Sequence, residues 1–389
     1  MSNSKSNTHI VLIGLVNLNE EKGDAQHFKS LSQYLNQHFK VSTITIEGYK
    51  LDNNYGISYP NNSIYRQFYW NLKITYLIIY FKLFSNAKLV YMRTMGSIIL
   101  PLYIAKLIGM KVGVEVNGII AEGYSNKIKL HKFLLNRYKS ILNRIDFINA
   151  SRGYANYIID LFRVNKSKVT FLNLGYTKLL SRYKKESCLE LLELDKNKER
   201  LLFIGNITEY QGLQYIIETC KDYKDLFYEK NLEVLIVGDG SYLGTLKKMV
   251  FDYKIEELVI FRSRVNKDKL RKYLSIGAIG LSPFDYKRGV KKSISGLKTY
   301  DYLFHKMPII TSIMDDASDF LEEKELGWVI RDFNSGSIKD IILNSIERDS
   351  RKNIKAAYEQ HYTYIEQSFS WENRFKKISK KLDEVIKQK

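Results

Sequence analysis

Residues 200–212 read RLLFIGNITEYQG: an almost unbroken apolar run, a glycine, a polar turn and a second glycine. A continuous apolar run that ends in glycine is typical of a strand buried on both faces of a parallel sheet. The chain opens in the same way, because residues 9–14 read HIVLIG. The sequence therefore predicts one α/β domain that begins near residue 9 and a second that begins near residue 200.

Strands alternate with helix-like segments through both halves, which predicts an α/β fold with a doubly wound parallel sheet in each half. Helices are expected between the strands, the longest at 66–84 and 128–144, and one after Ser151, which we expect to cap it. The predicted strands are 9–14, 41–46, 88–92, 111–116, 147–150 and 169–172, followed by 200–205, 233–238, 258–261, 276–281, 308–311 and 328–330.

The pattern divides the chain into four parts. Residues 1–176 and 200–369 form the two predicted Rossmann-like domains, and the charged stretch 177–199, which lacks a strand, is the predicted linker. A last helix, 370–389, follows Ser370 as its expected N-cap. Ligands of such sheets bind outside the carboxyl ends of the strands, so two of these domains are expected to face a cleft.

The charge balance is unusual. The 389 residues include 61 Lys and Arg against 42 Asp and Glu, a net charge of +19. Such a surplus favours anionic partners, namely nucleic acid, anionic lipid or phosphorylated substrates, although simple solubility in a lysine-rich proteome is an open alternative. No nucleic-acid-binding motif accompanies the charge, so a nucleic acid is not expected as a partner.

The two cysteines, Cys188 and Cys220, form no CxxC and have no nearby histidine, so neither a disulfide framework nor a zinc site is expected. The N-terminus has no signal-peptide pattern. The most apolar later run, 76–81, is far shorter than the ~20 residues of a spanning helix. We expect a cytoplasmic protein that is soluble or lies on a membrane surface.

Two glycine-rich turns follow predicted strands of the second half: Gly205 to Gly212, and Gly238-Asp239-Gly240. Turns of this kind let backbone N–H groups meet a phosphate at the positive end of a helix. Gly23, in the first domain, is expected to approach the same phosphate from across the cleft. Ordinary strand-to-helix turns are the alternative.

Residues 295–311, SGLKTYDYLFHKMPIIT, place Lys298 and Asp301 three apart on one face of a predicted helix. A lysine at a strand-to-helix junction can pair with a diphosphate, and a carboxylate one turn later can accept hydrogen bonds from ribose hydroxyls. A solvated surface ion pair of little energetic value is the alternative.

Several loops, in this order along nearly the whole chain, resemble those of retaining GT-B glycosyltransferases of the glycogen-synthase and sucrose-synthase type, which are common in bacterial polysaccharide assembly. Gly205-Asn206 and Gln211-Gly212 resemble the family's "GR-L…KG" turn, and 237–240 its "VGDG". Residues 296–309 resemble "PLK-FEYMA-GKPVI". In the second half, Phe261 to Val265 resembles the family's "F-G-V", and Ser370-Trp371 resembles the start of its final helix. In the first half, Glu115-Val116-Asn117 and Glu122 resemble an "EVN" and a later glutamate. Residues 151–154 resemble "SEGY", and residues 173–176 resemble the "NGV" that ends the domain.

The resemblance implies the GT-B fold, with the first domain binding the acceptor, the second binding a nucleoside diphosphate sugar, and the final helix crossing back to the first. It implies a co-substrate, most often UDP-linked, and no separate cofactor or metal. The donor-binding residues that it implies, together with those above, are Gly23, Gly205, Asn206, Gln211, Gly238, Asp239, Arg264, Lys298 and Asp301.

Some positions depart from the family pattern. The arginine and lysine that hold the donor diphosphate fall on Asn206 and Gln211, and the first glutamate of an E-x7-E motif falls near Ser293. Each lost charge-assisted contact is worth about 1.5–3 kcal/mol. The basic run 287–292 and Lys298 can replace these cations, or can hold an acidic donor sugar; a dead site is the third alternative.

For the transfer itself, Glu115, Asn117 and Glu122 are the candidates for positioning the donor sugar and the acceptor. A purely structural Glu115 is the alternative. We assign no enzymatic nucleophile, because retaining transfer in the family is thought to rely more on the donor itself. Asp315-Asp316 is expected to cap a helix rather than to bind a metal.

The acceptor is expected at a membrane. Residues 127–144 contain no acid, and their apolar residues, which include Phe133, Ile141 and Leu142, are interleaved with cations, as in helices that lie on anionic leaflets. Residues 66–84 look similar. Apolar sides that pack on the protein's own sheet are the alternative. The cations assigned to membrane or acceptor are Lys127, Lys129, Lys132 and Arg137.

Three functions remain in competition, and the order of the matched loops argues against one of them, a binding protein of another class that uses two Rossmann-like domains. The first is a glycosyltransferase at the inner face of the plasma membrane that acts on a lipid-linked glycan or another surface-polysaccharide precursor. The second is a non-catalytic GT-B subunit that binds an acceptor or a partner enzyme, which the loss of the arginine and lysine favours. A subunit of that kind has no reason to keep Lys298 and Asp301 on one face, so we favour the first.

Overall fold

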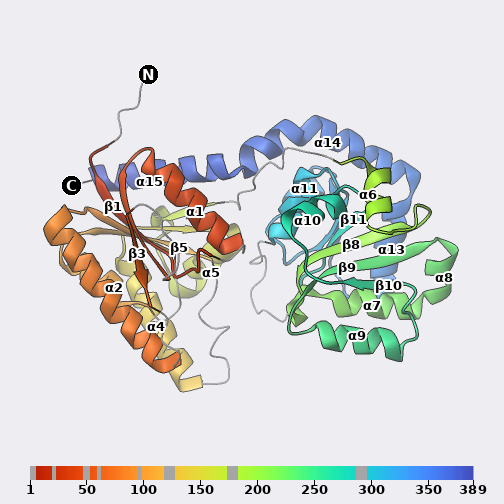
Figure 1. Cartoon of the computed structure of the whole chain (residues 1–389), viewed down its shortest axis with the longest axis horizontal. Helices are drawn as coiled ribbons and strands as arrows, with labels where there is room; N and C mark the ends of the chain where they lie inside the picture. The colour runs from red at the N-terminus through yellow and green to blue at the C-terminus, as the bar shows by residue number, and fades with distance from the viewer. Residues whose placement is uncertain are drawn as a thin grey trace. The chain divides into compact units, whose positions relative to one another are not determined.

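The computed structural model describes residues 6–19, 23–46, 53–58, 63–93, 98–117, 128–172, 183–285 and 296–388. The chain forms two compact units, one of residues 1–173 with 372–389 and the other of residues 174–371. Each unit contains one all-parallel sheet (Figure 1).

The sheet of the first unit has seven strands in the order β3-β2-β1-β4-β5-β6-β7. The chain runs outwards from β1 through β2 to β3 and then crosses to β4 on the other side of β1. The strand order therefore reverses between β1 and β4. The elements of this unit are β1 (His9–Ile13), α1 (Gly23–Asn36), β2 (Lys40–Ile46), β3 (Asn54–Ile57), α2 (Ser63–Ser85), β4 (Leu89–Arg93), α3 (Leu100–Leu107), β5 (Lys111–Val116), α4 (Ile128–Arg144), β6 (Phe147–Ala150), α5 (Arg152–Phe162), β7 (Val169–Phe171) and α15 (Trp371–Lys387).

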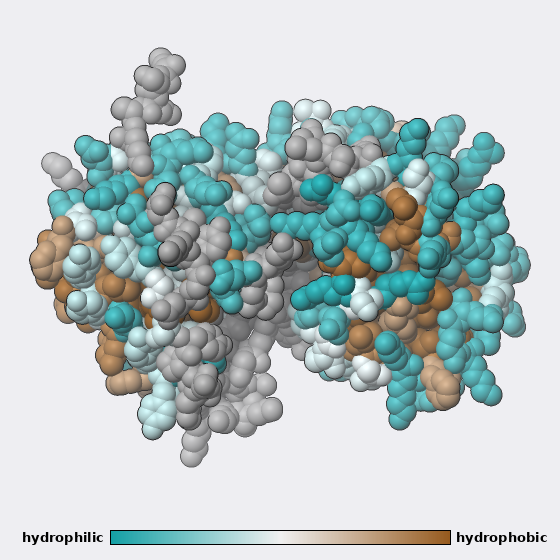
Figure 2. Space-filling view, viewed as in Figure 1, coloured by the Kyte–Doolittle hydropathy of each residue, from teal (hydrophilic) through white to brown (hydrophobic). Residues whose placement is uncertain are grey.

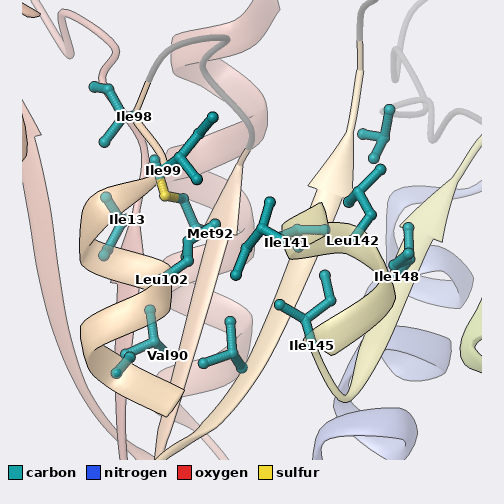
Figure 3. Packing of buried hydrophobic residues seen from close by; sticks show 14 of the residues in the cluster. Ile13, Val90, Met92, Ile98, Ile99, Leu102, Ile141, Leu142, Ile145 and Ile148 are labelled. Atoms are coloured by element: carbon teal, nitrogen blue, oxygen red, sulfur yellow. The ribbon is translucent and has the colours of Figure 1, made fainter. Parts of the chain in front are cut away.

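The hydrophobic core of the first unit joins β-strand residues to α2, α3, α4 and α5. Figure 3 shows Val90 and Met92 of β4 packed with Leu102 of α3 and Ile141 of α4. The last helix, α15, contacts α1, because the Phe375 ring lies 5.8 Å from His27 and 5.7 Å from Tyr34 between ring centroids. The C-terminal segment therefore completes the first unit.

The sheet of the second unit has six strands in the order β10-β9-β8-β11-β12-β13, which is the Rossmann order. One core packs α7, α9 and α13 on the sheet, and another packs α6, α10, α11, α12 and α14. The elements are α6 (Lys185–Leu191), β8 (Glu199–Asn206), α7 (Leu213–Asp222), α8 (Lys224–Glu229), β9 (Leu232–Asp239), α9 (Leu243–Asp252), β10 (Val259–Arg262), α10 (Lys267–Leu274), β11 (Ile279–Ser282), α11 (Leu297–Phe304), β12 (Ile309–Ser312), α12 (Ser318–Glu323), β13 (Gly327–Ile330), α13 (Ser335–Ile346) and α14 (Arg348–Phe369).

The predicted strands are present, with ends shifted by up to three residues. One strand, β3, was not predicted. Ser151 is the N-cap residue of α5, but its hydroxyl makes no capping hydrogen bond, which corrects the predicted cap. Among the helices of the described ranges, none is both long and apolar enough to cross a membrane.

Candidate functional site

The carboxyl ends of β8 and β9 come unusually close together. Gly205 pairs with Gly238 in the sheet, and a Cβ atom on Gly238 would lie 1.9 Å from the Gly205 carbonyl oxygen. Gly212 ends the turn after β8 with φ +74°, and a Cβ there would lie 1.7 Å from the Pro283 carbonyl oxygen. Side chains are therefore excluded at Gly212 and Gly238 by neighbouring backbone. Gly212 and Gly238 are buried, whereas Gly205 is partly exposed.

Lys298, in the first turn of α11, lies against Gly205. A Cβ on Gly205 would be 3.3 Å from the Lys298 Cε. The Lys298 ammonium donates a hydrogen bond to the Gln211 Oε1 atom and lies 3.7 Å from the centroid of the Phe203 ring. The structure thus brings together Gly205, Gln211 and Lys298, three of the predicted donor-binding residues.

Lys298 is not part of a solvated surface ion pair, since only 8% of the residue is exposed. Burial lowers the pKa of Lys298 well below its usual range, and the charge of Asp315 opposes this only in part. An anion bound beside Lys298 would favour its charged form. Among the described residues, the hydrogen-bond acceptor of Lys298 is the neutral Gln211 amide, and no carboxylate is in hydrogen-bonding contact with it.

Asp301 follows one turn later on α11 and is partly buried. Burial raises the pKa of its carboxyl group to about 7. The structure gives this carboxylate no hydrogen bond from the described residues, whereas the Asp301 backbone carbonyl accepts one from the His305 ring at 2.8 Å. Asp301 is thus left with acceptor capacity next to Lys298.

Asp315, which follows β12, holds the start of α11 through hydrogen bonds of its carboxylate. Its carboxylate accepts hydrogen bonds from the hydroxyls of Thr299 (2.5 Å), Thr311 (3.1 Å) and Ser282 (3.3 Å), and from the Ala317 N–H (3.0 Å). The group ties the ends of β11 and β12 to the helix that carries Lys298. The expected helix cap at Asp315-Asp316 is wrong, because Ala317 is the N-cap residue of α12. The role of Asp315 in joining these elements was missed.

These residues gather at one place in the topology. β8 and β11 are neighbours, and the strand order of the sheet reverses between them. The turn after β8 carries Gly205 and Gln211, and the segment after β11 leads to α11 and Lys298. Ligands of open α/β sheets bind at such a reversal, so this is the candidate site.

The other predicted donor-binding residues of the second unit lie at the edge of this cluster or away from it. Asn206 and Asp239 pair at the ends of β8 and β9, and Asp239 accepts a hydrogen bond from the Gly240 N–H at 2.7 Å. Arg264 is exposed after β10, the outermost strand, which β9 separates from β8. The topology does not bring Arg264 to Lys298.

A second cluster surrounds Glu115 at the end of β5 in the first unit. Its carboxylate accepts hydrogen bonds from Arg374 of α15 (3.0 Å), Asn117 (2.8 Å) and Tyr91 (3.2 Å), and the His27 Nε2 atom lies 3.8 Å away. Glu115 is 1% exposed. The carboxylate is thus committed to holding α15 on the sheet, which favours the structural alternative for this residue.

The electrostatics of this cluster support that role. Burial alone would raise the pKa of Glu115, but the charges of His27, Arg374 and Arg93 and the hydrogen bond from Asn117 lower it to about 2. Burial lowers the pKa of His27 to about 3, so its ring is neutral at neutral pH and becomes charged only in the acidic range where Glu115 itself titrates. Arg374 is therefore the cation that balances the buried carboxylate.

The remaining predicted residues of the first unit have mixed outcomes. Gly23 opens α1, while Glu122 and Lys127 lie outside the described residues, as does the basic run 287–292 of the second unit. Lys129 lies in α4, where Lys132 and Arg137 are exposed.

The burial of apolar residues of α4 corrects the part of the membrane prediction that placed them against lipid. Ile141 and Leu142 are buried in the core of the first unit, as Figure 3 shows. They pack on the protein's own sheet and are not free to contact lipid. Phe133, by contrast, is exposed.

The comparisons with known proteins agree with this architecture. Residues 186–361 match the model of the family described as "Glycosyl transferases group 1". Two curated relatives come from Methanocaldococcus jannaschii. The "Uncharacterized glycosyltransferase MJ1069" is 25% identical over 64% of this chain and 61% of its own length, and the "Uncharacterized glycosyltransferase MJ1607" is 19% identical over 49% and 48%. The chain thus spans about half to three fifths of these relatives.

Solved structures match over nearly the whole chain. A glycosyltransferase from Rickettsia africae has a TM-score of 0.75 at 15% identity, covering 98% of this chain and all of its own. Anabaena Alr3699/HepE in complex with UDP and glucose has a TM-score of 0.76 at 12% identity, covering 97% of this chain and all of its own. The fold is therefore GT-B, and the match to the group 1 glycosyltransferase model, residues 186–361, lies within the second unit.

Proposed function

We propose that this protein is a retaining glycosyltransferase that uses a nucleoside diphosphate sugar, with a UDP-sugar favoured. The observation that carries the proposal is the cluster of Gly205, Gln211, Lys298 and Asp301 at the strand-order reversal of the group 1 domain. The solved structures of Alr3699/HepE with UDP and with UDP-glucose, which share the fold, support the choice of co-substrate.

Each residue of the cluster has a proposed role. Lys298 and the backbone of the Gly205 turn stabilise the negative charge that develops on the leaving diphosphate. Asp301 accepts hydrogen bonds from the ribose hydroxyls. Gln211 accepts a hydrogen bond from Lys298, which a lysine at this position could not do, so the departure from the family pattern suits a buried Lys298.

The proposed acceptor is a lipid-linked glycan or another surface-polysaccharide precursor at the inner face of the plasma membrane. The exposed cations Lys132 and Arg137 of α4, together with the net charge of +19, support an anionic surface near the acceptor. Asn117 and Glu122 remain the proposed groups for positioning the sugars.

Nucleotide binding tests the proposal. Thermal unfolding is measured with UDP, GDP, ADP and CMP for the wild type, for Asp301→Ala and for the control Asp252→Ala, an exposed carboxylate of α9. A ligand at about 100 times its Kd adds about 2.7 kcal/mol to the free energy of unfolding. We expect one nucleotide, with UDP favoured, to raise the Tm of the wild type and the control, and to lose its effect in Asp301→Ala.

The alternative is the non-catalytic GT-B subunit, which Asn206 and Gln211 favour because they stand where the family has cations. Absence of a Tm shift with every nucleotide would select this alternative. For an active protein, slow hydrolysis of the donor tests retention, since NMR identifies the anomer of the sugar first released.

A further inference from the structure

Helix α2 is apolar on two opposite faces, only one of which is covered by the protein. Its inner face is buried in the core of the first unit and consists of Trp70, Ile74, Leu77, Ile78 and Phe81. Its outer face consists of Tyr65, Phe68, Leu72, Tyr76, Ile79 and Leu83, all exposed.

The outer face is a continuous line. Its members are three or four residues apart, so they lie above one another on the helix surface. Phe68 is 66% exposed and Leu83 71% exposed. A contiguous line of exposed apolar side chains of this length is suited to a partner. Figure 2 shows hydrophobic side chains gathered over α2.

The charged residues of the segment that contains this face all have one sign. Residues 53–114 contain seven Lys or Arg and no Asp or Glu. On α2 itself, Arg66 and Lys73 lie along one flank of the outer face and Lys82 along the other, as the helical repeat of about 100° per residue requires. The Arg66 guanidinium lies over the ring of the buried Trp70, 5.5 Å from its centroid. Lys73 and Lys82, one on each flank, are partly exposed, and their long side chains can extend towards anionic groups while the outer face is covered.

We propose that the outer face of α2 lies in the boundary between headgroups and acyl chains of an anionic phospholipid membrane. Two tyrosines in the line suit this boundary, because a tyrosine ring is apolar and its hydroxyl is polar. The flanking cations would meet lipid phosphates. A 23-residue helix can lie flat along such a surface over about 35 Å.

A second copy of the chain fits this face less well. Two outer faces packed together would bring cations of the same sign together, and α2 supplies no carboxylate to pair with them. The surplus positive charge would be buried at a cost, whereas an anionic leaflet neutralises it. The charge pattern thus selects lipid over self-association.

This inference specifies how the membrane proposed as a partner would be bound. It rests on the proposed function only for the idea that the acceptor lies at a membrane. It selects between the two segments expected at a membrane, residues 66–84 and residues 127–144. The apolar residues Ile141 and Leu142 of α4 belong to the core, so the outer face of α2 supplies the apolar insertion, while the exposed cations of α4 contribute charge.

Sedimentation of the full-length protein with vesicles tests the proposal. The vesicles are phosphatidylcholine alone or with about one third phosphatidylglycerol. The test variant combines Phe68→Ser, Leu72→Ser and Leu83→Ser. The matched control removes one Phe and two Leu that are equally exposed elsewhere, combining Phe251→Ser, Leu161→Ser and Leu191→Ser.

We expect the wild type and the control to bind the anionic vesicles, and the test variant to bind them at least about tenfold more weakly. Equal binding by the test variant and the wild type would overturn the proposal, as would absence of wild-type binding. A wild-type dimer that the test variant turns into a monomer, measured by light scattering, would identify a second copy as the occupant instead.

A reporter variant covers the case of a misfolded test variant. Phe68→Trp keeps an aromatic ring at the outer face, and its fluorescence is expected to shift to shorter wavelength only with anionic vesicles. No shift would also overturn the proposal. Nucleotide-dependent Tm shifts measured on all these variants keep this test separate from that of the donor site, since none of the substitutions touches the Lys298 cluster.

Discussion

Lys298 is a buried side chain whose proposed role in binding would come at a cost in stability. Its ammonium is buried beside the Phe203 and Phe284 rings, at 3.7 and 5.0 Å from their centroids, with the Gln211 amide as its hydrogen-bond acceptor. Desolvation of a cation is costly, and a neutral amide offsets less of that cost than a carboxylate does.

Replacing Lys298 by methionine should therefore separate stability from binding. We expect Lys298→Met to leave the free energy of unfolding unchanged or to raise it by about 1–2 kcal/mol, because an apolar chain of similar length replaces the buried cation. The same variant should lose the nucleotide-dependent Tm shift. Lys248→Met, at an exposed position of α9, serves as the control. A destabilised variant that still binds nucleotide would contradict the assignment.

The pH dependence of stability tests Asp301. Its folded-state pKa of about 7 lies above the ordinary value, so the stability it contributes is fully present below the ordinary pKa and is lost as pH rises through about 7. Asp301→Asn cannot ionise and should escape this loss. We therefore expect its Tm, relative to that of the wild type, to rise between about pH 4 and pH 8. A Tm difference that does not change with pH would show that Asp301 titrates normally.

At the scale of elements, the C-terminal helix α15 is held to the first unit by a buried ion pair as well as by apolar contacts. Arg374 and Glu115 are 4% and 2% exposed in their side chains, whereas Phe375, Ile378 and Leu382 provide the buried apolar side of the helix. Leaving one partner of such a pair uncompensated is costly, because the remaining charge cannot be solvated.

Glu115→Gln should thus destabilise the protein by about 3–5 kcal/mol in chemical denaturation. The exposed pair of Arg331 and Glu322, at 2.7 Å, supplies the control, and Glu322→Gln should cost less than about 1 kcal/mol. Because the pKa of Glu115 is lowered to about 2, its contribution is present above the ordinary pKa and fades as pH falls towards 2. Equal losses in the two variants would show that Arg374 does not depend on Glu115.

The elements that the sequence predicts well are those with a local signal. Apolar runs ending in glycine locate β1 and β8, and the 3.6-residue repeat locates α4 with its bounds at Ile128–Arg144. The edge strand β3 reads NYGI and buries only Ile57 fully, so it has no such signal. It is held by hydrogen bonds from the hydroxyls of Thr43 and Thr45 to the Asn54 side chain.

The same distinction between local signals and distant partners applies to the candidate site. Gly205, Gln211 and Lys298 could be predicted because each stands at the end of an apolar run or at the start of a helix. The partners of buried charges could not, because they come from distant parts of the chain: Arg374 lies 259 residues from Glu115. Only the folded structure shows that Asp315 and Arg374 are the groups around which these elements are fixed.

At the scale of the whole molecule, positive charge and exposed apolar surface occur in the same unit. The 62 residues from 53 to 114 lack acids, and α4 lacks them too, while the large exposed side chains of α2 belong to that stretch. Charge alone attracts a protein to an anionic surface at long range, whereas apolar insertion acts only on contact. The two contributions therefore respond differently to salt.

Raising the ionic strength should separate them. The Debye length falls from about 10 Å at 0.1 M to about 3 Å at 1 M salt, which removes most of the attraction due to the net charge of +19. Binding of the wild type to anionic vesicles should then fall steeply and level off at a residual binding that is due to the outer face of α2. The variant with Phe68, Leu72 and Leu83 changed to serine should fall much closer to zero, since it keeps only Tyr65, Tyr76 and Ile79 of the outer face. If the two proteins lost binding to the same extent, charge alone would account for the association, and α2 would need another partner.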